Sequence, residues 1–210
     1  MKVGIVASVK SDMIGIPLSY AQYIKDYLGG EIILLSPTSS FHNEIDLLIL
    51  PGGYDVNPMR YGEIPEYETS PPDIQKEYFD LYQLPLYISE KIPIFAVCRG
   101  LQTINVWARG TLNQDMYHET NTKDDPYGPV HHVRSYDGKI SFKVNSRHHQ
   151  SINKLGEGLT PLLHHKDGTI EAIIHKELPI FCVQWHPEDL LYEKESTEYI
   201  TNKLNEIMRK

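Results

Sequence analysis

Two motifs that suit nucleophilic catalysis lie far apart in this sequence. Cys98 ends the apolar run 94–97 and is followed by an amphipathic helical pattern. Ala96 and Gly100 place small residues two positions either side of it, where a strand and a helix backbone come close together. This pattern is typical of a nucleophile elbow, and the adjacent helix N-terminus favours the thiolate. A lone cysteine in a strand is more often structural, so the interpretation requires a base elsewhere.

The second motif, His186-Pro187-Glu188, supplies that base. It follows the apolar run 180–184, just as Cys98 follows its own strand. Because the carboxyl ends of parallel strands share one edge of a sheet, His186 can meet Cys98 there. Glu188 could accept a hydrogen bond from one imidazole nitrogen and fix the tautomer. Alone, the motif is more often a helix N-terminus with a favourable acid, but the two motifs together predict a Cys-His-Glu site.

The elements that must position these side chains follow from hydrophobic periodicity. Continuous apolar runs alternating with helical patterns predict an α/β fold, with a three-layer, mostly parallel central sheet covered by helices on both faces. With no repeat or linker in the sequence, we expect a single domain over residues 1–210. Strands are predicted at 3–7, 31–35, 45–50, 94–97, 140–145, 169–175 and 180–184, and helices at 17–28, 73–84 and 188–209.

Three segments are less regular. Pro85 should break or kink the helix that begins at 73. Residues 113–138 lack strong periodicity and are typical of a lid or site loop. The polar cluster 145–150 precedes a segment that we expect to be helix or turn.

A glycine pair follows the predicted strand 45–50. Gly52 and Gly53 leave backbone N–H groups bare at its carboxyl end, where a ligand can approach closely. Most Pro-Gly-Gly triplets are plain turns, so this motif is weak by itself.

Composition and charge exclude several classes. The net charge of −8 argues against nucleic acid as a partner. No segment approaches the roughly 18 apolar residues of a membrane span. Cys98 and Cys182 lack framework spacing, and residues 1–6 read as a strand and not a signal peptide. These features predict a cytoplasmic protein.

Three histidine pairs, 131–132, 148–149 and 164–165, raise the question of a metal. Neighbouring residues in a strand point to opposite faces, so none of the pairs chelates as it stands. No Cys/His ligand spacing accompanies them, and we expect no metal site.

Several motifs together resemble a known family. Residues 51–53, 98–102 and 183–188 look like a class I glutamine amidotransferase domain, which implies a flavodoxin-like fold. More narrowly, the sequence resembles the γ-glutamyl-γ-aminobutyrate hydrolase (peptidase C26) branch. The resemblance runs in order from about Asp46 to Glu188, while the first 45 residues match only as a strand-helix-strand pattern. The segments that carry the narrower resemblance are 61–63, 97–106, 110–115, 144–150 and 167–173.

The resemblance implies a cysteine hydrolase of γ-glutamyl amides that needs no cofactor. Cys98 would attack the γ-glutamyl carbonyl, and backbone N–H groups of Gly53 and Arg99 would form the oxyanion hole. His186 would pass the proton to the leaving amine and then activate water, with Glu188 orienting it.

Substrate contacts are also implied. Gln102 together with His148, His149 and Gln150 would hold the α-amino and α-carboxylate end of the glutamyl group. Arg147 has the fork geometry that suits a carboxylate, but its setting is more typical of a surface residue.

Two departures from the family pattern stand out. Ala96 occupies a position where the family usually has glycine, and Arg109 precedes Gly110 where a glycine pair is usual. If that position needs a positive φ, arginine costs about 1 kcal/mol there.

Three functional hypotheses remain open. The first is a stand-alone hydrolase of a small-molecule γ-glutamyl amide such as γ-glutamyl-γ-aminobutyrate, which segment 145–150 favours. The second is an amidotransferase subunit that delivers ammonia to a synthase partner. The third, a binding module, would be expected to have a damaged triad. A homodimer is left open.

Overall fold

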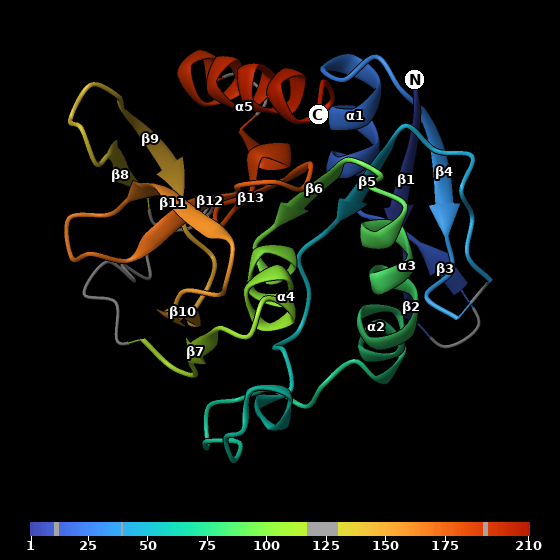
Figure 1. The fold of residues 1–210 in the computed structure, drawn as a ribbon, viewed down its shortest axis with the longest axis horizontal. Helices are drawn as coiled ribbons and strands as arrows, with labels where there is room; N and C mark the ends of the chain where they lie inside the picture. Colours follow the sequence, from blue (N-terminus) through green and yellow to red (C-terminus); the bar gives the residue numbers. More distant parts are fainter. Residues whose placement is uncertain (11–12, 39, 117–129, 191–192) are drawn as a thin grey trace.

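A large sheet forms the centre of the molecule (Figure 1). The computed structural model describes residues 1–10, 13–38, 40–116, 130–190 and 193–210, and in that part of the chain the sheet has nine strands in the order β4-β1-β5-β6-β13-β12-β11-β8-β9. The first five are parallel and the last four extend the sheet antiparallel. Their bounds are β1 Lys2–Val6, β4 Glu31–Leu35, β5 Leu47–Leu50, β6 Ile94–Val97, β8 Val130–Ser135, β9 Ser141–Asn145, β11 Leu159–His164, β12 Ile170–His175 and β13 Ile180–Val183.

Helices cover both faces of the sheet (Figure 1). One face carries α1 (Leu18–Asp26) and α5 (Lys194–Ile207); the other carries α2 (Ile74–Tyr78), α3 (Leu84–Ser89) and α4 (Arg99–Trp107). The predicted three-layer α/β fold is therefore confirmed.

The central strand β6 shows why the apolar runs are continuous. Ala96 packs in the core shared with α4, whereas Phe95 and Val97 pack in the core shared with α1 and α5. All four residues of β6 are buried, because both faces of the strand are covered.

The elbow has the expected geometry. Cys98 has φ 53° and ψ −107°, an uncommon conformation for a non-glycine residue. A Cβ atom at Gly100 would lie 2.4 Å from the carbonyl oxygen of Leu50, so this position requires glycine. Arg109 also has a positive φ, 67°. This agrees with the expectation that the family usually has glycine at this position because the backbone needs a positive φ there.

The chain stays helical through Pro85 but changes from α to π directly before it, an irregularity where a break or kink was predicted. Between α2 and α3 the chain forms a π-helical segment, η2 (Phe79–Gln83), in which the N–H of Leu84 donates to the carbonyl of Phe79. Pro85 then falls in the first turn of α3, where its missing N–H is not needed.

Other differences lie in short polar strands. The segment expected to be helix or turn contains β10 (Ser151–Lys154), which pairs with β7 (Thr111–Asn113). The expected loop 113–138 contains β8, and residues 117–129 lie outside the described part of the chain. Strands of three residues are too short for periodicity to show, which also hid the hairpin of β2 (Ser8–Lys10) and β3 (Met13–Gly15). The strand β11 was hidden by Pro161, a residue that is uncommon inside strands.

The last predicted helix is shorter than expected. A 3-10 turn, η3 (Pro187–Asp189), comes first, and α5 begins only at Lys194. Within the described ranges, no helix is long and apolar enough to cross a bilayer.

Candidate active site

Three strand ends converge at one edge of the parallel sheet. Strands β6 and β13 are neighbours with Val97 opposite Val183, so Cys98 and His186 follow at adjacent ends. Gly52, just after β5, completes the group: a Cβ atom there would lie 2.8 Å from Cε1 of His186 and 3.7 Å from Cβ of Cys98. The structure thus brings together residues that are far apart in the sequence.

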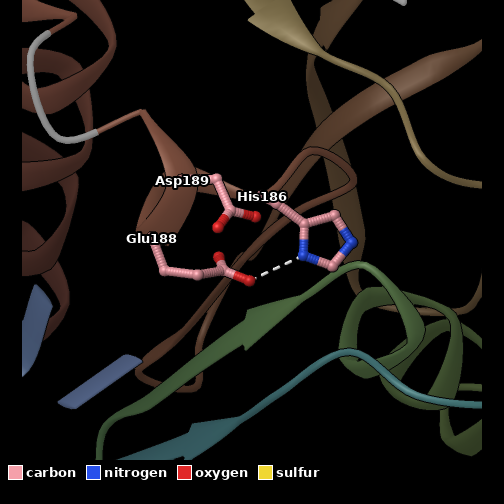
Figure 2. Close-up of side chains that lie close together, drawn as sticks. All are labelled: His186, Glu188 and Asp189. Carbon is pink, nitrogen blue, oxygen red and sulfur yellow. Dashed lines mark hydrogen bonds and ion pairs between the residues drawn. The ribbon is translucent and has the colours of Figure 1, made fainter. Parts of the chain in front are cut away.

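His186 and Glu188 form a short hydrogen bond. Nδ1 of His186 lies 2.6 Å from Oε1 of Glu188, whose side chain is buried (Figure 2). This contact leaves Nε2 to face Cys98. Burial alone would lower the pKa of His186, but the negative charge of Cys98 and hydrogen bonds to Cys98 and Glu188 raise it to about 11. Because a protonated histidine beside a cysteine favours the thiolate, we expect a thiolate–imidazolium pair here.

Asn145 holds the backbone of His186. Its Nδ2 donates to the carbonyl of His186 at 2.9 Å, and its Oδ1 accepts from the N–H of His186 at 2.8 Å. Asn145 ends β9, at the far edge of the sheet order. The sequence singled out segment 145–150 without giving Asn145 this role.

The two residues expected to form the oxyanion hole flank Cys98. Arg99 is the first residue of α4, where helical N–H groups lack partners within the helix. Gly53 lies against Arg99, because a Cβ atom at Gly53 would be 3.1 Å from Cδ of that arginine. Gly52, the neighbour of Gly53, lies against Cys98, so both residues lie close to the nucleophile, and the oxyanion hole itself remains a prediction.

The Arg99 side chain turns away into a buried ion cluster. Its guanidinium lies 2.8 Å from both Glu77 and Asp80, and Arg60 lies 3.1 Å from Asp80. Burial opposes the charged form, but Asp80 and Glu77 raise the pKa of Arg99. We call Arg60, Glu77, Asp80 and Arg99 the anchor cluster, because it ties the start of α4 to α2 and the π-helical segment.

The four predicted substrate residues divide into two groups. His149 is part-exposed and lies 3.0 Å from Asp55. The side chains of Gln102, His148 and Gln150 are buried. Gln102 donates to the carbonyl of Gln150 at 3.3 Å. Nδ1 of His148 lies 2.9 Å from the same carbonyl. Cys98 and Glu188 are buried to a similar degree, so burial does not decide between these residues, and their contact with substrate remains a prediction.

Behind these residues lies a buried carboxylate that sequence analysis missed. Glu171 is fully buried, and its Oε1 lies 3.3 Å from Nε2 of His131 and 3.7 Å from Nε2 of His148. A charged residue within the apolar strand 170–175 was the available signal. Its position indicates a supporting role for the segment that carries His149.

A cavity of about 810 Å³ opens beside His186. Arg147, predicted to be a surface residue, lines it, and its Nη1 lies 2.6 Å from Oδ2 of Asp189. Polar residues that also line the cavity include Tyr54, Asp73, Lys76 and Glu188.

His186, Glu188 and Asp189 also offer ligand atoms within 4.8 Å of one another, as a metal site would (Figure 2). However, Nδ1 of His186 already binds Glu188, and Arg147 neutralises Asp189. The expectation that no metal takes part remains a prediction.

Comparison with known proteins places this geometry in a family. The Peptidase C26 family model matches residues 9–188. The glutamine amidotransferase-like protein YvdE of Lactococcus lactis is 36% identical over 197 residues, covering 86% of this chain and 82% of that protein.

Two relatives carry more specific names. The γ-glutamyl-γ-aminobutyrate hydrolase of Escherichia coli O157:H7 is 29% identical, over 69% of this chain and 65% of that protein. The γ-glutamyl-CDP-amidate hydrolase of Campylobacter jejuni is 31% identical, over 71% and 66%.

Solved structures agree on the fold. PurLQS from Thermotoga maritima superposes with a TM-score of 0.69 at 14% identity, covering 98% of both chains. A glutamine amidotransferase from the same organism gives 0.60 at 16% identity, covering 98% of this chain and 84% of that one. With the family model matching most of its length, this chain belongs to the peptidase C26 family of class I glutamine amidotransferase-like proteins.

Proposed function

We propose that this chain is a cysteine hydrolase that cleaves small γ-glutamyl amides to glutamate and an amine. The observation that carries the proposal is the convergence of Cys98, His186 and Glu188 at one sheet edge, with the His186–Glu188 contact at 2.6 Å. Membership of the peptidase C26 family supports γ-glutamyl amide hydrolysis in general.

The reaction begins with attack of the Cys98 thiolate on the γ-carbonyl carbon. The tetrahedral oxyanion is stabilised by the backbone N–H groups of Gly53 and Arg99, each worth roughly 3 kcal/mol in comparable sites. Nε2 of His186 gives its proton to the leaving nitrogen, and the C–N bond breaks to leave a γ-glutamyl thioester.

Hydrolysis of the thioester completes the cycle. His186 takes a proton from water, which attacks the thioester carbon, and glutamate leaves as the C–S bond breaks. Glu188 holds the imidazole in the required orientation throughout. Gln102 and His149 are the side chains that we expect to contact the glutamyl group.

The identity of the leaving amine is the more specific part of the proposal. Because His186 protonates it, the amine belongs on the side of His186, where the cavity of about 810 Å³ lies. This volume exceeds what ammonia needs, which favours γ-glutamyl-γ-aminobutyrate or a related conjugate over glutamine. The names of two relatives, which differ in their amine, support the same reaction type.

Incubation of the purified chain with a panel of γ-glutamyl amides, including glutamine, tests the proposal through glutamate release. Cys98→Ala should abolish turnover, whereas Cys182→Ala should keep it, because Cys182 is fully buried in β13. Turnover by Cys98→Ala would sink the proposal. Glutamine hydrolysis that appears only with a synthase partner would instead favour the amidotransferase alternative.

A further inference from the structure

Lys76 is a buried lysine beside the oxyanion turn that the proposed reaction leaves unused. It lies on α2, its exposure is 3%, and its Nζ donates to the carbonyl oxygen of Gly52 at 2.7 Å. A Cβ atom at Gly53 would lie 2.9 Å from the same Nζ. The ammonium therefore packs directly against the Gly52–Gly53 peptide group.

This peptide group contains the donor assigned to the oxyanion hole. Its carbonyl belongs to Gly52 and its N–H to Gly53, and the bond is trans. In a trans peptide the C=O and N–H point in opposite directions. Anchoring the carbonyl on Lys76 therefore aims the Gly53 N–H away from Lys76.

A glycine pair needs such an anchor. Glycine populates both signs of φ readily, so a Gly-Gly peptide can rotate with little steric hindrance. On the other side, the N–H of Gly52 donates to Oη of Tyr20 at 3.1 Å. Tyr20 fixes the preceding peptide group, and Lys76 fixes the one that carries the oxyanion donor.

The charge of Lys76 adds to the effect of its geometry. Burial and the neighbouring Arg99 lower its pKa to about 8, against the opposing influence of Asp73, Asp80 and Cys98. It is thus mostly protonated at neutral pH. A charged donor strengthens the hydrogen bond and polarises the amide, which makes its N–H a better donor.

We infer that Lys76 is a positioning residue for catalysis: its bond to the Gly52 carbonyl holds the Gly53 N–H toward the oxyanion. The inference rests on the proposed function, since it concerns the same tetrahedral intermediate. Asp73 supports Lys76 by capping α2, with its carboxylate accepting from the N–H groups of Gln75 and Lys76.

The test compares Lys76→Met with Lys203→Met, a matched substitution of a part-buried lysine on α5 that pairs with Glu206. We expect Lys76→Met to lower kcat/KM for the best γ-glutamyl amide roughly 10- to 100-fold. This is less than the roughly 10²- to 10³-fold loss on removing a donor outright, because the N–H is displaced and not deleted. Lys203→Met should match the wild type.

A pair of inhibitors separates positioning from general damage. The aldehyde 5-oxopentanoate can form a tetrahedral adduct with Cys98 whose oxygen needs the oxyanion hole, whereas pentanoate has no oxygen at that end. In Lys76→Met, the Ki of the aldehyde should rise by about the factor lost in kcat/KM. The Ki of pentanoate should stay unchanged.

Lys76→Gln covers the case in which the methionine variant does not fold. Its neutral amide can still donate to the Gly52 carbonyl, so a smaller loss of aldehyde affinity is expected. Equal losses of affinity for the aldehyde and for pentanoate would indicate a structural role and overturn the inference, as would wild-type aldehyde affinity in a folded Lys76→Met. A wild-type protein without γ-glutamyl amide turnover would refute the proposed function instead.

Discussion

At the scale of single residues, the proposed chemistry depends on one pair of charges, the thiolate of Cys98 and the imidazolium of His186. The negative charge of Cys98 contributes to the raised pKa of His186, and Glu188 contributes the rest. A group whose pKa is raised on folding stabilises the native state fully below its unfolded pKa. That contribution is lost as the pH rises toward the folded pKa. Here the window runs from about pH 6.5 to about pH 11.

Cys98→Ala should lower the pKa of His186, because the substitution removes the thiolate charge and its hydrogen bond while leaving Glu188 in place. Titration of the labelled imidazole by NMR measures this shift. Cys182→Ala, which removes a thiol remote from the imidazole, is the control. An unchanged His186 titration in Cys98→Ala would contradict the thiolate–imidazolium pair.

At the scale of elements, the anchor cluster joins α4 to the irregular helix before it. The π-helical segment η2 follows α2, which carries Glu77, and precedes α3. Asp80 lies within it. Both carboxylates reach Arg99, the first residue of α4. Such π segments often occur at functional sites, and here one helps to hold the start of the elbow helix.

Arg99→Met should therefore destabilise the fold by roughly 3–5 kcal/mol, because it leaves the buried carboxylates of Glu77 and Asp80 to share the one guanidinium of Arg60. Chemical denaturation measures the loss. Lys139→Met, which removes an exposed pair with Asp137, should leave the free energy of unfolding close to that of the wild type. An equal change in the free energy of unfolding for the two variants would show that the anchor cluster adds little to the stability of the fold.

The sequence predicted the elements that carry chemistry better than those that support them. The apolar runs of β5, β6 and β13 and the motif after each of them were sufficient to bring the glycine pair, the elbow cysteine and the histidine to one edge of the sheet. Lys76 and the anchor cluster were not predicted, because charged residues on an amphipathic helix look like a solvated face. Glu171 was hidden for a different reason: one histidine partner, His131, lies on β8, which periodicity did not predict, and the other, His148, lies in the loop after β9.

At the scale of the whole molecule, we expect substrate selectivity to depend on the cavity beside His186. Arg147 and Asp189 neutralise each other at its wall. Arg147 keeps further N–H donors for a ligand, since a guanidinium has five.

Three γ-glutamyl amides of similar size test this arrangement: those of γ-aminobutyrate, butylamine and putrescine, whose far ends are negative, neutral and positive. Arg147→Ala should lower kcat/KM for the γ-aminobutyrate amide roughly 10-fold, since one charged hydrogen bond is lost. The same substitution should raise kcat/KM for the putrescine amide, because Asp189 is left unpaired. It should leave kcat/KM for the butylamine amide unchanged.

Arg134→Ala, which removes an exposed arginine on β8, is the control for that change. Equal losses for all three amides would mean that Arg147 holds the glutamyl group instead.

The clamp of Asn145 on His186 has a consequence for how small such an enzyme can be. The nucleophile and its oxyanion turn need only the parallel part of the sheet, yet the base is tethered from the outermost antiparallel strand. Without β9, the imidazole of His186 would lose this tether while the sulfur of Cys98 stayed in place. Turnover is therefore expected to need both the parallel and the antiparallel part of the sheet.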